Sequence, residues 1–152
     1  MEVYRLSRER FAGSLSGRGA AICGARWNSV GVELIYTAGN RSLAMAEVVV
    51  HLTLASLPDD FVMMKILIPD HIDYREVNVE ELPLHWNAFP YPSADQRIGD
   101  QFVAENLYCV LKIPSAVTKG DFNYLINPKH PDFSFISIVE VTKFPFDKRI
   151  FK

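Results

Sequence analysis

Residues 33–57 read ELIYTAGNRSLAMAEVVVHLTLASL. The run from Glu33 to Thr37 has the composition of a strand, and Gly39-Asn40 marks a turn. From 42 to 55, apolar residues recur at helical spacing on two adjacent faces, which predicts a helix that is mostly buried. The stretch therefore predicts a strand, a turn and a buried helix in direct succession.

The rest of the chain predicts further strands on both sides of this unit. They are expected at residues 3–6, 62–68, 107–113 and 133–142. Residues 14–19 are glycine-rich and predict a loop, and the proline-rich residues 70–93 predict a surface excursion. Ser93 and Gln96 have the spacing of a capping box, which predicts a second helix that runs to about Asn106. Separated strands, two helices and no β-α-β rhythm favour an α+β fold around a mainly antiparallel or mixed sheet.

Composition limits the class of protein. The chain has 152 residues, of which 49% are hydrophobic and 22% are charged, so we expect a single domain over residues 1–152 with a real core. A net charge of −2 lacks the basic balance of a dedicated nucleic-acid binder. The most apolar stretch, Val48 to Leu57, is far shorter than the ~20 residues that a membrane helix needs. Because no signal-peptide pattern opens the sequence, we expect a soluble, cytoplasmic protein with no membrane partner.

Cysteine and histidine spacing predicts no metal site. Cys23 and Cys109 lie far apart, which favours two free thiols, and the histidines show no paired ligand spacing.

Glu47 is the charged residue that stands out. It is the only one between Arg41 and Asp59, and it lies in the apolar helix. A carboxylate in such a setting costs free energy unless it has a partner, and burial raises its pKa. One interpretation is a local pair with His51, one helical turn away. The other is a carboxylate held in a cleft to stabilise positive charge or to orient a hydroxyl.

Arg26 and Ser115 each allow two interpretations. Arg26 lies beside Trp27 in a glycine-flanked segment, where a guanidinium binds phosphate or carboxylate, or stacks on the indole at the surface. Ser115 follows a predicted strand and Pro114, a place that holds a hydroxyl rigidly. No nucleophile-elbow motif surrounds it, so the alternative is a turn serine that bonds its own backbone.

Taken in order, several segments resemble the RES-domain family, which is named for an Arg, a Glu and a Ser. The matching segments are GRGA at 17–20, ARWN at 25–28, IYTA at 35–38, LAMAE at 43–47, VLKIPSA at 110–116, NYLINP at 123–128, HP at 130–131 and FDKR at 146–149, with Gly31 and Gly99-Asp100 between them. The three named residues correspond to Arg26, Glu47 and Ser115. One departure is Ala25, where the family form has Gly, and it adds only a methyl group.

The resemblance implies a bacterial type II toxin that depletes NAD, with a fold similar to that of ADP-ribosyltransferases. It also implies an antitoxin partner with an Xre-like helix-turn-helix, through which the complex would bind DNA indirectly. NAD is then the substrate, and no cofactor is expected. The reaction is cleavage of the nicotinamide–ribose N-glycosidic bond, by hydrolysis or phosphorolysis.

This chemistry suggests a role for each residue. The nicotinamide leaving group is already cationic and needs no general acid, whereas the ribosyl cation that forms needs negative charge nearby. We assign Glu47 to that cation and the ribose hydroxyls, and Arg26 to the anionic part of NAD. Ser115 would orient Glu47 or bond the ribose. Tyr36 would stack on nicotinamide, or is an ordinary strand aromatic. Further NAD contacts are expected from Arg5, Asn28 and Asn123.

Two alternatives stay open at this point. ADP-ribosyl transfer onto a protein uses the same site and the same cation. A non-enzymatic binding module would have Glu47 as a structural residue and Arg26 as a partner contact. In the enzyme interpretations, we expect the antitoxin to block the Arg26–Glu47 cleft, and residues 70–93 are open to being a lid.

Overall fold

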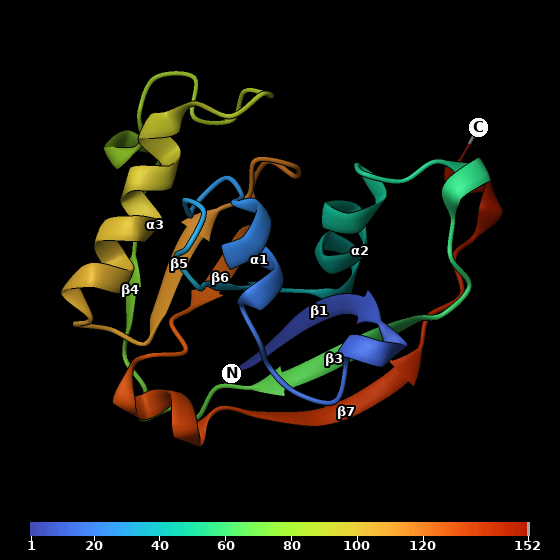
Figure 1. Cartoon of the computed structure of the whole chain (residues 1–152), viewed down its shortest axis with the longest axis horizontal. Coiled ribbons are helices and arrows are strands. Elements are labelled where there is room, and N and C mark those ends of the chain that lie inside the picture. Colours follow the sequence, from blue (N-terminus) through green and yellow to red (C-terminus); the bar gives the residue numbers. More distant parts are fainter. Residues whose placement is uncertain (152) are drawn as a thin grey trace.

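A computed structural model describes residues 1–151, and in this range one sheet has the strand order β4-β5-β6-β2-β1-β3-β7 (Figure 1). Its strands are β1 (Glu2–Arg8), β2 (Ile35–Ala38), β3 (Phe61–Leu67), β4 (Tyr74–Glu76), β5 (Val110–Pro114), β6 (Phe122–Ile126) and β7 (Ser137–Lys143). The α-helices are α1 (Arg18–Cys23), α2 (Arg41–Val49) and α3 (Ser93–Glu105). β4 runs parallel to β5, and the other neighbouring pairs are antiparallel. The predicted α+β fold with a mixed sheet is confirmed.

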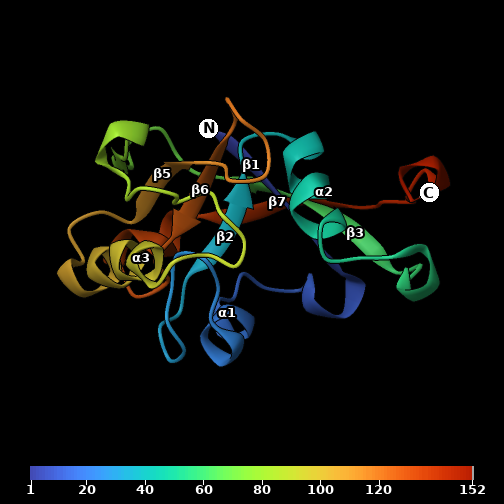
Figure 2. The ribbon, with the colours of Figure 1, turned by 90° about the horizontal axis from the view of Figure 1, so that it is seen from above.

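The sheet opens between β1 and β2. β1 pairs with β3 along its whole length from Glu2 to Arg8, but it meets β2 through the pair Tyr4 and Ala38. Figure 1 shows the consequence, since β1, β3 and β7 run across the molecule while β5 and β6 rise steeply beside them. Helix α2 lies next to this opening (Figures 1 and 2).

Side chains from the sheet pack into three buried clusters. One contains Val3, Ile35, Met64 and Ile126, the second lies against α2 with Leu6, Ala38 and Leu43, and the third lies against α3 with Trp27, Leu34, Phe102 and Leu111. Strand β2 contributes to all of them because successive side chains point to opposite faces. Ile35 enters the first cluster, whereas Tyr36 and Ala38 belong to the other two. A short strand thus fixes the two helices relative to each other.

Helix α2 is shorter and more exposed than the prediction for residues 42–55. It ends at Val49, its buried residues are Leu43 and Ala44, and Val50 is 57% exposed. The run of three valines at its end disfavours a helix, because β-branched side chains lose rotamer freedom there. Part of the apolar surface that predicted burial in the core instead faces a cavity, described below.

Helix α3 begins where it was predicted, but without the capping box. Its N-cap is Pro92, and no side chain caps this end within the described chain. Gln96 instead donates from Nε2 to the carbonyl oxygens of Ala25 and Asn28, at 3.1 and 3.2 Å. The side chain that predicted a cap therefore holds the loop that carries Arg26.

Other expectations also needed correction. Helix α1 begins at Arg18, inside the predicted loop 14–19, and β7 begins at Ser137, after a 3-10 turn at Pro131–Phe135 where the strand 133–142 was expected. Strands β4 and β6 were not predicted. Within residues 1–151, the helices fall short of the length and apolar character that a bilayer span requires.

Candidate active site

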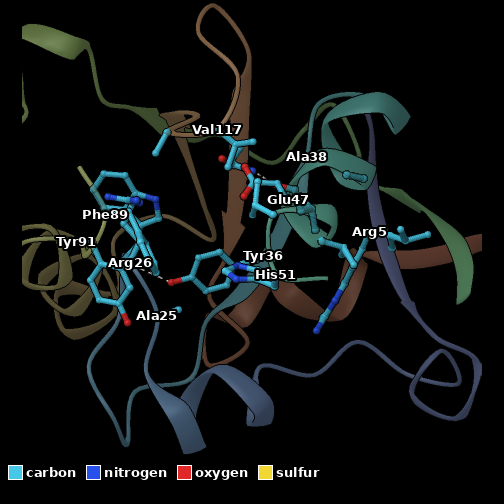
Figure 3. Close-up of a pocket in the computed structure, with 18 of the residues that line it drawn as sticks. Arg5, Ala25, Arg26, Tyr36, Ala38, Glu47, His51, Phe89, Tyr91 and Val117 are labelled. Atoms are coloured by element: carbon cyan, nitrogen blue, oxygen red, sulfur yellow. Dashed lines mark hydrogen bonds between the residues drawn. The ribbon is translucent and has the colours of Figure 1, made fainter. Parts of the chain in front are cut away.

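A cavity of about 710 Å³ lies over the opening between β1 and β2. Its lining comes from β1, β2, β6, α2, the Arg26 loop, residues 87–91 and the start of the turn after β5. The structure brings five of the predicted site residues to this cavity: Arg5, Arg26, Tyr36, Glu47 and Asn123. In Figure 3, Arg26 with Phe89 and Tyr91 forms one side, Arg5 lies on the other, and Tyr36 and Glu47 lie between them.

Glu47 projects from α2 toward the ends of β5 and β6. Ser115 donates from Oγ to its Oε1 at 3.2 Å. Burial raises the pKa of Glu47, while hydrogen bonds from Asn123 and Ser115 and electrostatic interactions with Arg26 and His51 act in the opposite direction. The described chain shows no hydrogen bond or ion pair between Glu47 and His51, so the alternative of a local pair is not found. The carboxylate is instead held by polar groups from the sheet.

Ser115 is both a turn serine and a partner of Glu47. Its side chain is buried, and its Oγ accepts from the backbone N–H groups of Val117 and Thr118, at 3.1 and 3.0 Å. These bonds fix the oxygen and direct its own proton toward Glu47. Nearby, Asn123 donates to the carbonyl oxygen of Thr37 at 3.2 Å, which fixes its amide beside the same carboxylate.

Arg26 makes its hydrogen bonds to the rest of the described chain through Nη1. Its Nη1 donates to the carbonyl oxygens of Trp86 and Ala88, at 2.6 and 3.0 Å, and lies 3.2 Å from Oδ2 of Asp95. The guanidinium also lies 5.5 Å from the ring centre of Tyr91. The predicted alternative of a stack on Trp27 is not found, because that indole stacks on Trp86 instead. Within residues 1–151 these bonds engage Nη1 alone, which leaves Nε and Nη2 for a ligand.

Tyr36 and Asn28 support the loop that carries Arg26. The hydroxyl of Tyr36 accepts from the backbone N–H of Trp27 at 3.0 Å and donates to Oδ1 of Asn28 at 2.6 Å. Burial raises the pKa of Tyr36, so the hydroxyl stays neutral. Asn28 is fully buried, and its amide donates to three backbone carbonyls. The structure therefore brings Tyr36 to the cavity but leaves Asn28 behind it.

Arg5 is the second cation of the cavity. Its Nη1 donates to the carbonyl oxygen of Ser16 at 3.0 Å, and burial lowers its pKa. Unlike Arg26, it has no carboxylate within ion-pair distance in the part of the chain that the structure describes. A desolvated guanidinium without a counter-charge favours an anionic ligand.

The sequence did not reveal how α3 supports this site. Asp95 pairs with Arg26, Gln96 holds the loop, and Asp100 accepts from the backbone N–H and hydroxyl of Ser29, at 2.8 and 2.5 Å. A Cβ on Gly99 would lie 1.6 Å from the carbonyl oxygen of Trp27, so only glycine allows this approach. An acid in the first turn of a helix is common, and nothing local distinguishes Asp95 from such a residue.

The cavity thus brings together a half-buried carboxylate, two arginines and an aromatic ring. The family model of the RES domain matches residues 2–147, and the chain belongs to this family.

Two curated relatives extend the comparison. A "Prs ADP-ribosylating toxin" of Sphingobium sp. (strain YBL2) is 36% identical over 143 residues, which are 93% of this chain and 89% of the relative. A "Toxin Res" of Photorhabdus laumondii is 36% identical over 156 residues, which are 100% of this chain and 98% of the relative.

The fold also matches a solved structure. A chain of the M. tuberculosis MbcT–MbcA toxin–antitoxin complex superposes with a TM-score of 0.78, covering 95% of this chain and 84% of that one. Its sequence identity is 18%, so this likeness concerns the fold.

Proposed function

We propose that the chain is a toxin that consumes NAD by cleaving the bond between nicotinamide and ribose. The observation that carries the proposal is Glu47, a carboxylate in the cavity that Ser115 fixes from one side. The similarity to proteins named as RES toxins, one of them ADP-ribosylating, supports it.

Glu47 supplies the negative charge that the reaction requires. As the C–N bond breaks, its electron pair passes to the ring nitrogen of nicotinamide, which leaves as a neutral molecule. Positive charge develops on the ribose, and a carboxylate held nearby stabilises it more than it stabilises the ground state. Water or phosphate then adds to the ribose carbon, and water loses a proton to the solvent as it adds. A fixed carboxylate needs little reorganisation, which is the contribution of Ser115 and Asn123.

The two arginines differ in the part they play. Arg26 already has a carboxylate partner in Asp95, which balances its charge. Its free Nε and Nη2 therefore serve mainly to orient the pyrophosphate through hydrogen bonds. Arg5 has no such partner among the described residues, and we assign it the larger share of the pyrophosphate charge. Tyr36 lies in the cavity between the two arginines (Figure 3). We assign its ring to stacking on the nicotinamide.

ADP-ribosyl transfer is the second candidate. The observation that favours it is the name of the Sphingobium relative, an ADP-ribosylating toxin. The same cation forms, and a side chain of another protein takes the place of water or phosphate. Glu47 and Arg5 serve either outcome equally.

A helix-turn-helix antitoxin is the proposed partner. The solved complex that shares this fold is a toxin with its antitoxin, which supports an inhibitor for this chain too. Such an inhibitor would block the cavity between Arg26 and Glu47. Val50 and Phe89, 57% and 78% exposed, give that cavity an apolar rim for a protein partner.

The test is NAD consumption by purified protein, with and without phosphate, with the products separated by chromatography. Release of nicotinamide establishes glycosidic cleavage, and free ADP-ribose, its phosphate or labelled protein identifies the acceptor. We expect Glu47→Gln to lose at least ~10²-fold in rate, the usual effect of removing one transition-state contact. Circular dichroism should show an unchanged fold.

Glu80→Gln is the matched control, because it makes the same change at an exposed place away from the cavity. It should keep wild-type activity. A folded, fully active Glu47→Gln protein would refute the role of Glu47. If wild-type protein without antitoxin leaves NAD intact even with cell extract as acceptor, the binding-module alternative is favoured.

A further inference from the structure

The segment 84–92 forms one wall of the cavity without helix or strand. It brings Asn87, Phe89 and Tyr91 to the lining, and Phe89 is 78% exposed. Its backbone hydrogen bonds are local turns, from Trp86 to Pro83 and from Ala88 to His85. A segment without regular secondary structure needs contacts with other parts of the chain to hold a single conformation.

Arg26 provides side-chain hydrogen bonds that join this segment to a part of the chain that is distant in sequence. Its Nη1 binds the carbonyl oxygens of Trp86 and Ala88. The neighbouring Trp27 stacks on Trp86, with ring centres 6.1 Å apart, and the guanidinium lies over Tyr91. Figure 3 shows Arg26 beside Phe89 and Tyr91, so the same side chain lines the cavity and holds its wall.

Asp95 lies behind Arg26, and its burial lowers the stability of the native state. Its side chain has no solvent exposure, Oδ2 is 3.2 Å from Nη1 of Arg26, and Oδ1 has no hydrogen-bond partner in the described chain. A buried carboxylate with an unsatisfied oxygen is unfavourable, and the start of α3 offsets only part of that cost. An apolar side chain would fill the same place without the penalty.

We infer that Asp95 is a positioning residue, which aims the guanidinium of Arg26 and thereby holds segment 84–92 in place as a wall of the substrate cavity. This inference rests on the proposed function, since the wall affects catalysis only if NAD occupies the cavity. Asp95 itself does not line the cavity. Its effect must therefore pass through Arg26.

Asp95→Asn tests the inference, because it removes the charge with little change in shape. Hydrogen exchange followed by mass spectrometry should show segment 84–92 exchanging at least ~10-fold faster, while β1, β3 and β6 keep their protection. The matched control is Glu105→Gln, at the exposed end of the same helix, where exchange in segment 84–92 should match wild type.

A second variant covers the case in which Asp95→Asn does not fold. Arg26→Lys keeps a positive charge near Asp95, but an ammonium on a flexible stem cannot reproduce the planar contacts to two carbonyls and a carboxylate. It should loosen segment 84–92 in the same way. Wild-type exchange there in a folded Asp95→Asn or Arg26→Lys protein overturns the inference.

Kinetics separate positioning from a general loss of structure. Asp95→Asn should raise the KM for NAD about tenfold, the scale of one charge-assisted hydrogen bond, with kcat changed far less. A merely structural role would lower the amount of active enzyme and leave KM unchanged, and that result would count against positioning. If wild-type protein consumes no NAD, the proposed function fails, whereas the exchange experiment still reports on Asp95.

Discussion

Glu47 lies in a setting that opposes its own ionisation. Burial raises its pKa, and the groups that lower the pKa are the amide of Asn123, the hydroxyl of Ser115 and, through electrostatic interaction, Arg26 and His51. The site therefore holds a carboxylate whose charge is only partly balanced. Such a carboxylate interacts most favourably with a positive charge that develops beside it, and a ribosyl cation requires this stabilisation.

This arrangement predicts an acid limit for activity. If the reaction requires ionised Glu47, kcat/KM should fall on acidification with an apparent pKa above 4.5, the ordinary value for glutamate. The measurement is a pH profile of NAD consumption. Loss of activity only below that ordinary range, in a protein that stays folded, would contradict a catalytic carboxylate with a raised pKa.

The same pKa shift predicts how stability depends on pH. The native state holds the Glu47 proton more tightly than the unfolded chain, so its contribution to stability falls as pH rises from the unfolded pKa through the raised native one. Glu47→Gln removes that loss. Its Tm should exceed that of wild type at neutral pH, by about 2–4 °C per kcal/mol in a chain of this size. The difference should vanish below the ordinary glutamate pKa, and a variant less stable than wild type at neutral pH would contradict it.

At the scale of single residues, sequence reasoning found the groups that line the cavity better than the groups that hold them. Glu47 was conspicuous because it is a charge in an apolar helix. Asp95 was not, because its burial depends on the Arg26 loop packing against it from about seventy residues earlier in the sequence. Asn28 shows the reverse error, since a polar residue near Arg26 proved to bond backbone carbonyls behind the site.

Helix α3 acts as the support of the Arg26 loop at the scale of elements. Gln96 and Asp100 bond that loop through side chains, and Gly99 lets the helix backbone approach the carbonyl oxygen of Trp27. The helix and the loop therefore form one unit, and the position of Arg26 depends on the closeness of this packing.

Gly99→Ala should break that unit. The added methyl would lie 1.6 Å from a backbone oxygen, so helix and loop must separate. We expect a loss of at least ~2 kcal/mol in the free energy of unfolding, measured with urea. Gly19→Ala in α1 is the control, because its Cβ would meet nothing within 4 Å, and it should be neutral or stabilising. Equal stability of the two variants would argue against close packing at Gly99.

Elements were predictable where their signal is local. The strands around residues 3–6, 33–37 and 62–68 carry their own apolar patterns and were found. Strand β4 is three exposed residues whose pairing with β5 is the main reason it exists, so no local pattern marks it. The burial of α2 was overestimated for a related reason. Its apolar surface lines a cavity, and periodicity alone does not distinguish a cavity from a core.

At the scale of the whole molecule, the cavity depends on the sheet being split. Arg5 comes from β1, on the side of β3 and β7, whereas Tyr36 comes from β2, which continues through β6 to β5. The two halves meet through the pair Tyr4 and Ala38, through α2, and through the buried cluster that contains Val3 and Ile35. A ligand that contacts Arg5 and Tyr36 together would bridge both halves of the sheet.

Such a ligand should stabilise the native state as a whole. We expect Glu47→Gln to bind NAD without consuming it, so NAD at 100 times its Kd should add about 2.7 kcal/mol. For a chain of this size that corresponds to a Tm increase of about 5–10 °C. Arg5→Gln in the same background should shrink the shift, because the unpaired cation on β1 is then lost. The measurement is differential scanning fluorimetry over a range of NAD concentrations. A Tm that does not respond to NAD in folded Glu47→Gln would mean that the cavity belongs to a different ligand.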